Sequence, residues 1–167
     1  MDVILIAAVT QDGFIARQEN EITSWTKDLW LFKKQTMGFP VIMGSNTWSC
    51  IKTELKNRKV IVIHRNDVAK QVLSKISSKK CFVAGGGRTN AKFFNELTHL
   101  YLTPHPLLFG SGVRLFHNAK EELKLSQEKI VPVDEKAAIY QYQYKIIRTA
   151  KNVPNKSSYS FPPLFLS

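Results

Sequence analysis

One acidic residue stands where its carboxylate could do chemistry. Asp28 follows Trp25 in the sequence and precedes Leu29, Trp30 and Phe32, all of them apolar. A carboxylate among apolar groups can accept two parallel hydrogen bonds from an amidine-like ring edge. Partial burial would raise its pKa, because desolvation disfavours the charged form. The alternative is an aspartate in the first turn of a helix that faces water, and the residue types alone favour that alternative.

A glycine run and an arginine offer a second kind of chemistry, the binding of phosphate. The segment Gly85-Gly86-Gly87-Arg88 follows an apolar run and precedes a predicted helix. Backbone N–H groups in such a turn can hold a phosphate, and glycine lets the ligand approach closely. Arg65 follows another apolar run and can grip a phosphate with two hydrogen bonds. Neither feature matches a dinucleotide or P-loop motif, and each alone is better explained by an ordinary turn.

Several other chemistries lack their patterns in this sequence. The four histidines have no spacing typical of metal ligands and the two cysteines lie far apart, so no metal site is expected. The serine elbow of hydrolases and the zinc-binding motif of deaminases are both absent. Arg58 is a further candidate, since an arginine beside a pocket can hold a carboxylate.

The charge balance is the unusual feature of the composition. Lysine and arginine number 24 and aspartate and glutamate 13, which gives a net charge of +11. This excess favours anionic partners such as phosphates, polycarboxylates or nucleic acid, although it also suits a solvated basic surface. Two cysteines exclude a disulfide scaffold, and no apolar stretch is long enough for a membrane span. Because the apolar amino terminus lacks a basic leader, we expect a cytoplasmic protein without membrane partners.

Alternating strands and helices must position these residues. Buried strands are predicted at 3–9, 40–44, 59–63, 81–84 and 100–103. Helices are predicted between them, at 26–36, 45–51, 68–76 and 89–97. Later strands at 124–133 and 138–144 complete an α/β protein whose central sheet is mostly parallel, with antiparallel C-terminal strands and helices on both faces. We expect one domain over residues 1–148 and an irregular tail over residues 149–167.

The candidate residues and motifs fall in one specific order along these elements. Ligands of such sheets bind beyond the carboxyl ends of strands, where Arg65, the glycine run and Thr103 all fall. From residue 3 to residue 148 the chain resembles the dihydrofolate reductase superfamily. The matching stretches are Trp25-x-x-Asp28-Leu29-x-x-Phe32-Lys33, Met43-Gly44-x-x-Thr47-Trp48, Leu55-x-x-Arg58, Gly85-Gly86-Gly87-Arg88 and Leu100-Tyr101-Leu102-Thr103. The resemblance implies a three-layer fold and the reduction of dihydrofolate, or a related pterin, with NADPH as cofactor.

The resemblance also implies roles for individual residues. Asp28 would bind the pterin amino group and ring nitrogen, Thr103 would share its hydrogen-bond network, and Arg58 would hold the glutamate α-carboxylate. The residues implied to line the substrate are Ala8, Leu29, Phe32, Ile51 and Leu55. The residues implied to hold NADPH are Ala8, Ile15, Gly44, Ser45, Thr47, His64, Arg65, Ala84, Gly85, Gly86, Gly87, Arg88 and Thr89. In this family the glycines that match Gly85-Gly86 are joined by a cis peptide.

Several departures from the family pattern point to a second branch of the superfamily. Ser45 stands where many members have an arginine for the cofactor phosphate, and Asn90 where a tyrosine often packs on the nicotinamide. The run from Pro106 to Phe116 resembles the riboflavin-pathway reductases, which reduce a phosphoribosylated pyrimidine with NADPH. Arg58 and the stretch 43–48 favour dihydrofolate, and the riboflavin-type substrate remains as the alternative.

Two further possibilities concern macromolecular partners. A nucleic-acid-binding module would use the basic residues Lys33, Lys34, Lys79, Lys80 and Arg88. No RNA- or DNA-binding motif accompanies them, so this function is not expected. Tyrosines at 140, 142 and 144 and the apolar tail residues 161–165 fit packing within a monomer or across a homodimer. The predicted partners are therefore a small-molecule substrate and NADPH, with a homodimer left open.

Overall fold

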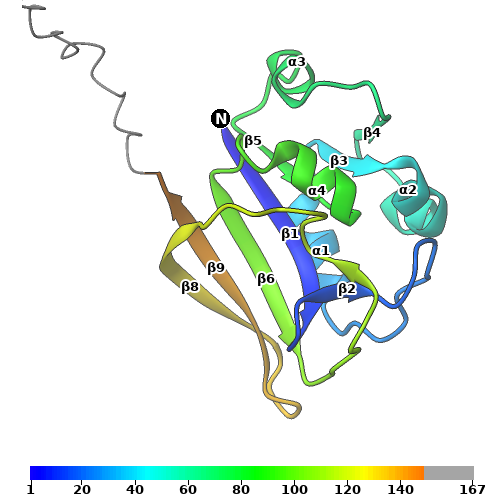
Figure 1. Cartoon of the computed structure of the whole chain (residues 1–167), viewed down its shortest axis with the longest axis vertical. Helices are drawn as coiled ribbons and strands as arrows, with labels where there is room; N and C mark the ends of the chain where they lie inside the picture. The colour runs from blue at the N-terminus through cyan, green and yellow to red at the C-terminus, as the bar shows by residue number, and fades with distance from the viewer. Residues whose placement is uncertain (149–167) are drawn as a thin grey trace, which may run out of the picture.

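A seven-stranded mixed sheet forms the centre of the computed structural model, which describes residues 1–148 (Figure 1). The strands lie in the order β4-β3-β5-β1-β6-β9-β8. They are β1 (Asp2–Thr10), β3 (Val41–Gly44), β4 (Val60–Ile63), β5 (Lys80–Val83), β6 (His99–His105), β8 (Lys124–Asp134) and β9 (Ile139–Ile147). The first five in this order pair in parallel, whereas β9 is antiparallel to both β6 and β8. The predicted sheet, mostly parallel with antiparallel C-terminal strands, is confirmed.

Short helices and a second small sheet complete the fold. The helices are α1 (Leu29–Thr36), α2 (Ser45–Ile51), the 3-10 helix η1 (Lys52–Leu55), α3 (Ala69–Ser74) and α4 (Gly87–Phe93). The small sheet pairs β2 (Phe14–Ala16) with β7 (Val113–Arg114) in antiparallel fashion. The sequence analysis does not predict this pair, because β7 has only two residues and its partner lies far away in the chain.

Successive residues of β1 enter the core on opposite sides of the sheet, as the pleat of a strand requires. Val3 and Leu5 pack in one cluster with Phe93 of α4. Ile4 lies in a second cluster, against which Phe32 of α1 packs. Helices therefore cover both faces of the sheet, and the predicted three-layer fold is confirmed.

The first helix begins later than the sequence predicts. The prediction of a helix over 26–36 with Thr26 as its cap is wrong, since α1 starts at Leu29. The hydroxyl of Thr26 donates instead to the carbonyl of Thr23 (3.4 Å), and the backbone N–H of Lys27 donates to Nε2 of His105 (2.9 Å). Asp28 becomes the N-cap residue but makes no side-chain capping bond. Its carboxylate is thus not used by its own helix.

Three remaining sequence predictions concern the backbone and the C-terminal strands. The helix predicted at 89–97 begins earlier, at Gly87, and the Gly85–Gly86 peptide is cis as the resemblance implies. Tyr142 and Tyr144 stack at 6.4 Å, and Tyr144 packs against the main core. The predicted tail lies outside the described residues. Over residues 1–148, no helix is long and apolar enough to cross a membrane.

We predict that Gly87→Ala destabilises the fold by about 2 kcal/mol or more, as overpacking does. A Cβ at Gly87 would lie 2.4 Å from the backbone oxygen of Arg114 in β7, which cannot rotate away. Gly110→Ala is the matched control: its φ of 73° is strained for alanine but the space is open, so about 1 kcal/mol is expected. Urea unfolding measures both variants. Equal losses would show that α4 and β7 separate easily.

Candidate active site

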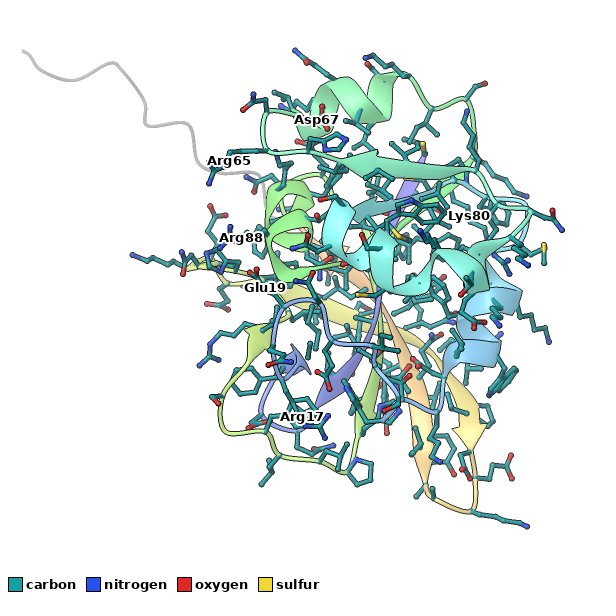
Figure 2. All side chains as sticks on the ribbon, turned by 90° about the vertical axis from the view of Figure 1, so that its right-hand side faces the viewer. Arg17, Glu19, Arg65, Asp67, Lys80 and Arg88 are labelled. Carbon is teal, nitrogen blue, oxygen red and sulfur yellow. The ribbon has the colours of Figure 1, made fainter. Side chains whose placement is uncertain are left out.

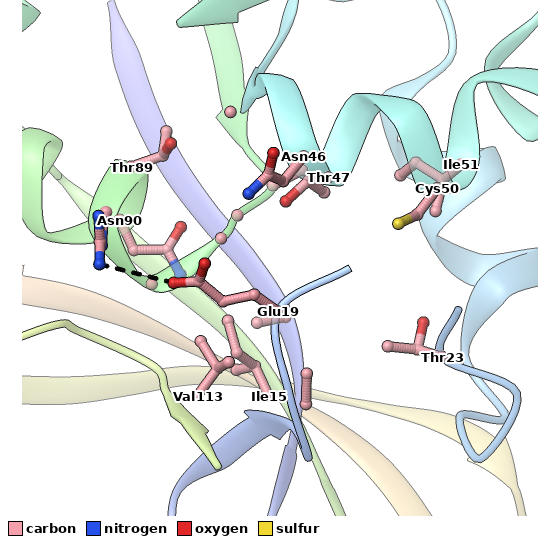
Figure 3. Close-up of a pocket in the computed structure, with 18 of the residues that line it drawn as sticks. Ile15, Glu19, Thr23, Asn46, Thr47, Cys50, Ile51, Thr89, Asn90 and Val113 are labelled. Carbon is pink, nitrogen blue, oxygen red and sulfur yellow. Dashed lines mark ion pairs between the residues drawn. The ribbon is translucent and has the colours of Figure 1, made fainter. Parts of the chain in front are cut away.

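A cavity of about 540 Å³ opens where β1, β3, β4 and β5 end (Figure 3). Parallel strands end at the same edge of a sheet, so residues distant in sequence meet there. The predicted site residues that line it are Ala8, Ile15, Asp28, Leu29, Phe32, Gly44, Ser45, Thr47, Ile51, His64, Arg65, Ala84, Gly85, Gly86, Gly87, Arg88 and Thr89. Leu55, Arg58 and Thr103 do not line it. In Figure 3, Ile51 of α2 and Ile15 of β2 lie on opposite sides of the cavity.

Asp28 provides a buried carboxylate at the end of the cavity formed by Leu29 and Phe32 of α1 and Ile51 of α2. Only 7% of Asp28 is exposed. Burial raises the pKa of this carboxyl above its ordinary value. The residue types alone favour an aspartate that faces solvent, whereas the folded protein buries Asp28.

Two residues of β6 stand behind Asp28. Thr103 is fully buried, and its hydroxyl has no hydrogen bond of normal geometry among the described residues. His105 is 1% exposed and accepts a hydrogen bond at Nε2 from the backbone of Lys27, so its proton lies on Nδ1 and is donated to the carbonyl of Thr103 (2.8 Å). This neutral imidazole fixes the backbone directly before Asp28. Nothing in the residue types around His105 predicts this role, because its partners are backbone groups.

Glycines form the wall at the other end of the cavity. The backbone N–H of Gly44 at the end of β3 donates to the carbonyl of Gly85 (2.9 Å). A Cβ at Gly44 would lie 2.8 Å from Oγ1 of Thr89, and one at Gly86 would lie 3.5 Å from Oγ1 of Thr47. Backbone rather than side chain thus faces the cavity here, which suits a ligand that must approach closely.

Basic side chains stand at the rim of this glycine end. Arg65 follows β4, and Arg88 lies in the first turn of α4; both line the cavity and point to the same side of the molecule (Figure 2). Arg88 pairs with Glu19 at 3.7 Å, and both partners are more than half exposed, so the pair is weak. Arg65 makes no side-chain ion pair or hydrogen bond within residues 1–148. Its guanidinium remains available for an anionic ligand.

Two expected substrate residues have other surroundings. Leu55 is 2% exposed and packs with Val41 and Met43 in the core. The guanidinium of Arg58 donates to Thr36 Oγ1 (3.1 Å), to the carbonyl of Lys33 (2.7 Å) and to the carbonyl of Lys56 (3.1 Å). These bonds connect the segment after η1 to the end of α1. They use three of the five N–H donors of Arg58.

Asn90 is a lining residue whose amide the sequence analysis leaves without a role. It is 1% exposed, and its Nδ2 donates to the carbonyl of Leu115 (2.8 Å). Its Oδ1 is buried without a partner among the described residues. A buried acceptor of this kind is costly unless a donor reaches it. Asn90 lies on α4 beside Thr89, at the glycine end of the cavity (Figure 3). A ligand bound there can donate a hydrogen bond to its Oδ1.

Comparisons with known proteins agree with this geometry. The family model "Dihydrofolate reductase" matches residues 2–149. A dihydrofolate reductase of Buchnera aphidicola subsp. Schizaphis graminum is 32% identical over 132 residues, which cover 72% of this chain and 81% of that protein. One from Bacillus subtilis is 35% identical over 113 residues, 60% of this chain and 67% of that protein.

Solved structures share the fold. Dihydrofolate reductase from Enterococcus faecalis, complexed with NADP(H) and RAB-propyl, has a TM-score of 0.70 at 21% identity and covers 87% of this chain and 96% of its own. A putative riboflavin biosynthesis protein from Shewanella has a TM-score of 0.61 at 17% identity, covering 89% and 100%. With a family model that spans nearly its whole length, this chain belongs to the dihydrofolate reductase family and is an NADPH-dependent oxidoreductase.

Proposed function

We propose that this chain reduces dihydrofolate to tetrahydrofolate and that Asp28 anchors the pterin ring. The observation that carries the proposal is the buried Asp28 carboxylate at the apolar end of a cavity whose other end is glycine-lined and basic. A flat heterocycle with two adjacent N–H donors fits the first end. A dinucleotide with phosphates fits the second end.

The glycine end has the properties that the cofactor requires. A Cβ at Gly44 would crowd Oγ1 of Thr89, and Gly86 carries no side chain beside Thr47, so the backbone itself is open to a close ligand. The unpartnered Oδ1 of Asn90 offers a buried acceptor, and Arg65 offers a free cation. NADPH, when bound, supplies the hydride for the C=N carbon of the pterin.

The protein contributes position and charge to this reaction. Asp28 holds the pterin edge through two hydrogen bonds, and its position is set by the Lys27–His105 bond. The apolar side chains of Leu29, Phe32 and Ile51 exclude water from the ring faces and strengthen these hydrogen bonds. Asp28 is the buried carboxylate beside these apolar side chains, and we expect water to carry the proton to the ring nitrogen.

We propose that Arg58 binds the glutamate tail of the substrate with the two N–H donors that have no partner within residues 1–148. The three bonds to Thr36, Lys33 and Lys56 hold the guanidinium in one orientation. A donor held in place loses less conformational freedom when it binds a carboxylate.

We also propose that the chain acts in the cytoplasm, where its free cysteines Cys50 and Cys81 stay reduced. A homodimer would use the exposed strand β8, whose Leu125 and Ile130 are 39% and 47% exposed. Sedimentation velocity decides between monomer and dimer. An absorbance spectrum of the purified protein tests the alternative of a nucleic-acid-binding module, because bound nucleic acid raises the ultraviolet signal in a salt-dependent way.

We predict that Asp28→Asn lowers the rate of dihydrofolate reduction by about a hundredfold or more. The amide presents one acceptor in place of two and carries no charge. The rate is followed by the loss of NADPH absorbance, with the exposed Asp2→Asn as a matched control that keeps wild-type activity. Turnover that survives in Asp28→Asn contradicts the proposed anchor. No turnover by the wild type, with NADPH still bound tightly, moves the substrate to the riboflavin-type pyrimidine.

We predict that the same variant is more stable than the wild type near neutral pH. Burial raises the pKa of Asp28 in the folded protein above the ordinary value of 3.8. The folded protein therefore binds this proton more tightly than the unfolded chain, and the stabilising contribution is lost as the pH rises through the raised pKa. Asparagine does not ionise, so its advantage in thermal unfolding should be present at neutral pH and shrink as the pH falls towards 3.8. An advantage independent of pH contradicts this cause.

A further inference from the structure

The turn after β4 carries Arg65, a cation of the cavity rim whose side chain has no partner within residues 1–148. This turn, His64-Arg65-Asn66-Asp67, is named the β4 turn here. Its first three residues are exposed, and His64 and Arg65 line the cavity. Its own hydrogen bonds close it locally: the N–H of Asp67 donates to the carbonyl of His64 (3.2 Å), and the N–H of His64 donates to Oδ2 of Asp67 (2.7 Å).

One side chain joins this turn to the rest of the molecule. Nζ of Lys92, on α4, donates to the carbonyls of Arg65 (2.7 Å), Asp67 (2.6 Å) and His64 (3.3 Å). Among the described residues, every other hydrogen bond of the β4 turn stays within the turn itself. The orientation of the turn relative to α4 therefore depends on Lys92.

The three bonds occupy the whole donor capacity of the ammonium group. A lysine has three N–H donors and no acceptor, and Lys92 has three carbonyl partners. Although Lys92 also lines the cavity, no donor of its Nζ remains for a ligand there. The ammonium group of Lys92 therefore holds the backbone that bears Arg65. We expect Lys92 to make no direct contact with a cofactor phosphate.

We propose that Lys92 is a specificity-determining positioning residue, which fixes the β4 turn so that Arg65 meets the 2′-phosphate that distinguishes NADPH from NADH. This inference rests on the proposed function. Of the two arginines at the glycine end, Arg88 pairs with Glu19 whereas Arg65 has no side-chain partner within residues 1–148, so Arg65 carries much of the discrimination. Figure 2 shows Arg65 beside Asp67 at the edge of the molecule. A fixed backbone there reduces the conformational freedom that Arg65 loses when it binds an anion.

The test compares the binding of NADPH and NADH, measured by quenching of tryptophan fluorescence. The variants are Lys92→Met, Arg65→Met and the double variant. We expect Lys92→Met to lower the preference for NADPH over NADH by about tenfold, the size of one lost charge-assisted contact. In the Arg65→Met background the same change should have no further effect, because the residue through which Lys92 acts is gone.

Controls separate this role from general stability and charge. Lys70→Met removes an exposed lysine of α3 near the same turn and should leave the preference unchanged. Lys92→Arg retains the charge and several donors, so it should restore part of the preference. Thermal unfolding confirms that each variant is folded at the temperature of the binding experiment.

Three results would overturn the inference. An unchanged preference in Lys92→Met shows that the turn is fixed without Lys92. If the losses of NADPH preference in the two single variants add in full in the double variant, Lys92 acts without Arg65 and contacts the phosphate itself. A wild type that binds neither dinucleotide overturns the proposed function together with this inference, whereas the first two results leave the proposed function intact.

Discussion

The hydrogen bond from Gly44 to Gly85 is the contact on which the site depends, because it joins the ends of β3 and β5 at 2.9 Å. Glycine at position 44 also keeps the junction open, because a Cβ there would lie 2.8 Å from Oγ1 of Thr89 on α4. Since α2 starts at Ser45 and α4 at Gly87, both helices leave from this junction. The junction thereby fixes one end of the cavity and the segment from which Lys92 reaches the β4 turn.

The Asp28 end of the cavity lowers the stability of the folded protein. Burial of Asp28 disfavours the charged form, and the carboxylate receives no capping bond from α1 in return. The surrounding structure holds it there through His105, whose two nitrogens bind Lys27 and Thr103. A site that binds a polar ring edge in an apolar cavity needs such an unsatisfied group, because a carboxylate already saturated by the protein has nothing to offer a ligand.

The sequence predicts the sheet well because buried parallel strands are continuous apolar runs, as in Val41-Ile42-Met43. It predicts Asp28 and the glycine run as site residues because the residue types and the order of the family motifs along the chain indicate them. It does not predict the roles of Lys92 and His105, because their partners are backbone groups. Every residue type has a backbone carbonyl, so the sequence does not show which carbonyl a side chain will meet. The misplaced Thr26 cap has the same origin: a tertiary bond from Lys27 overrides a local preference that the residues alone support.

The loop after β6 bears on the choice between the two substrates. The riboflavin-type substrate carries a phosphate, and the run after Pro106 that resembles that branch is where cations would be needed. In this chain the Asp12 carboxylate accepts hydrogen bonds there from the backbone of Phe109 (3.1 Å) and Gly110 (2.7 Å). Its bond from the Thr10 hydroxyl is the main reason that the pKa of Asp12 is lowered, which keeps the carboxylate charged. Asp12 therefore occupies these backbone amides, and residues 107–111 do not line the cavity that holds Asp28, so this loop provides no phosphate site for the riboflavin-type substrate.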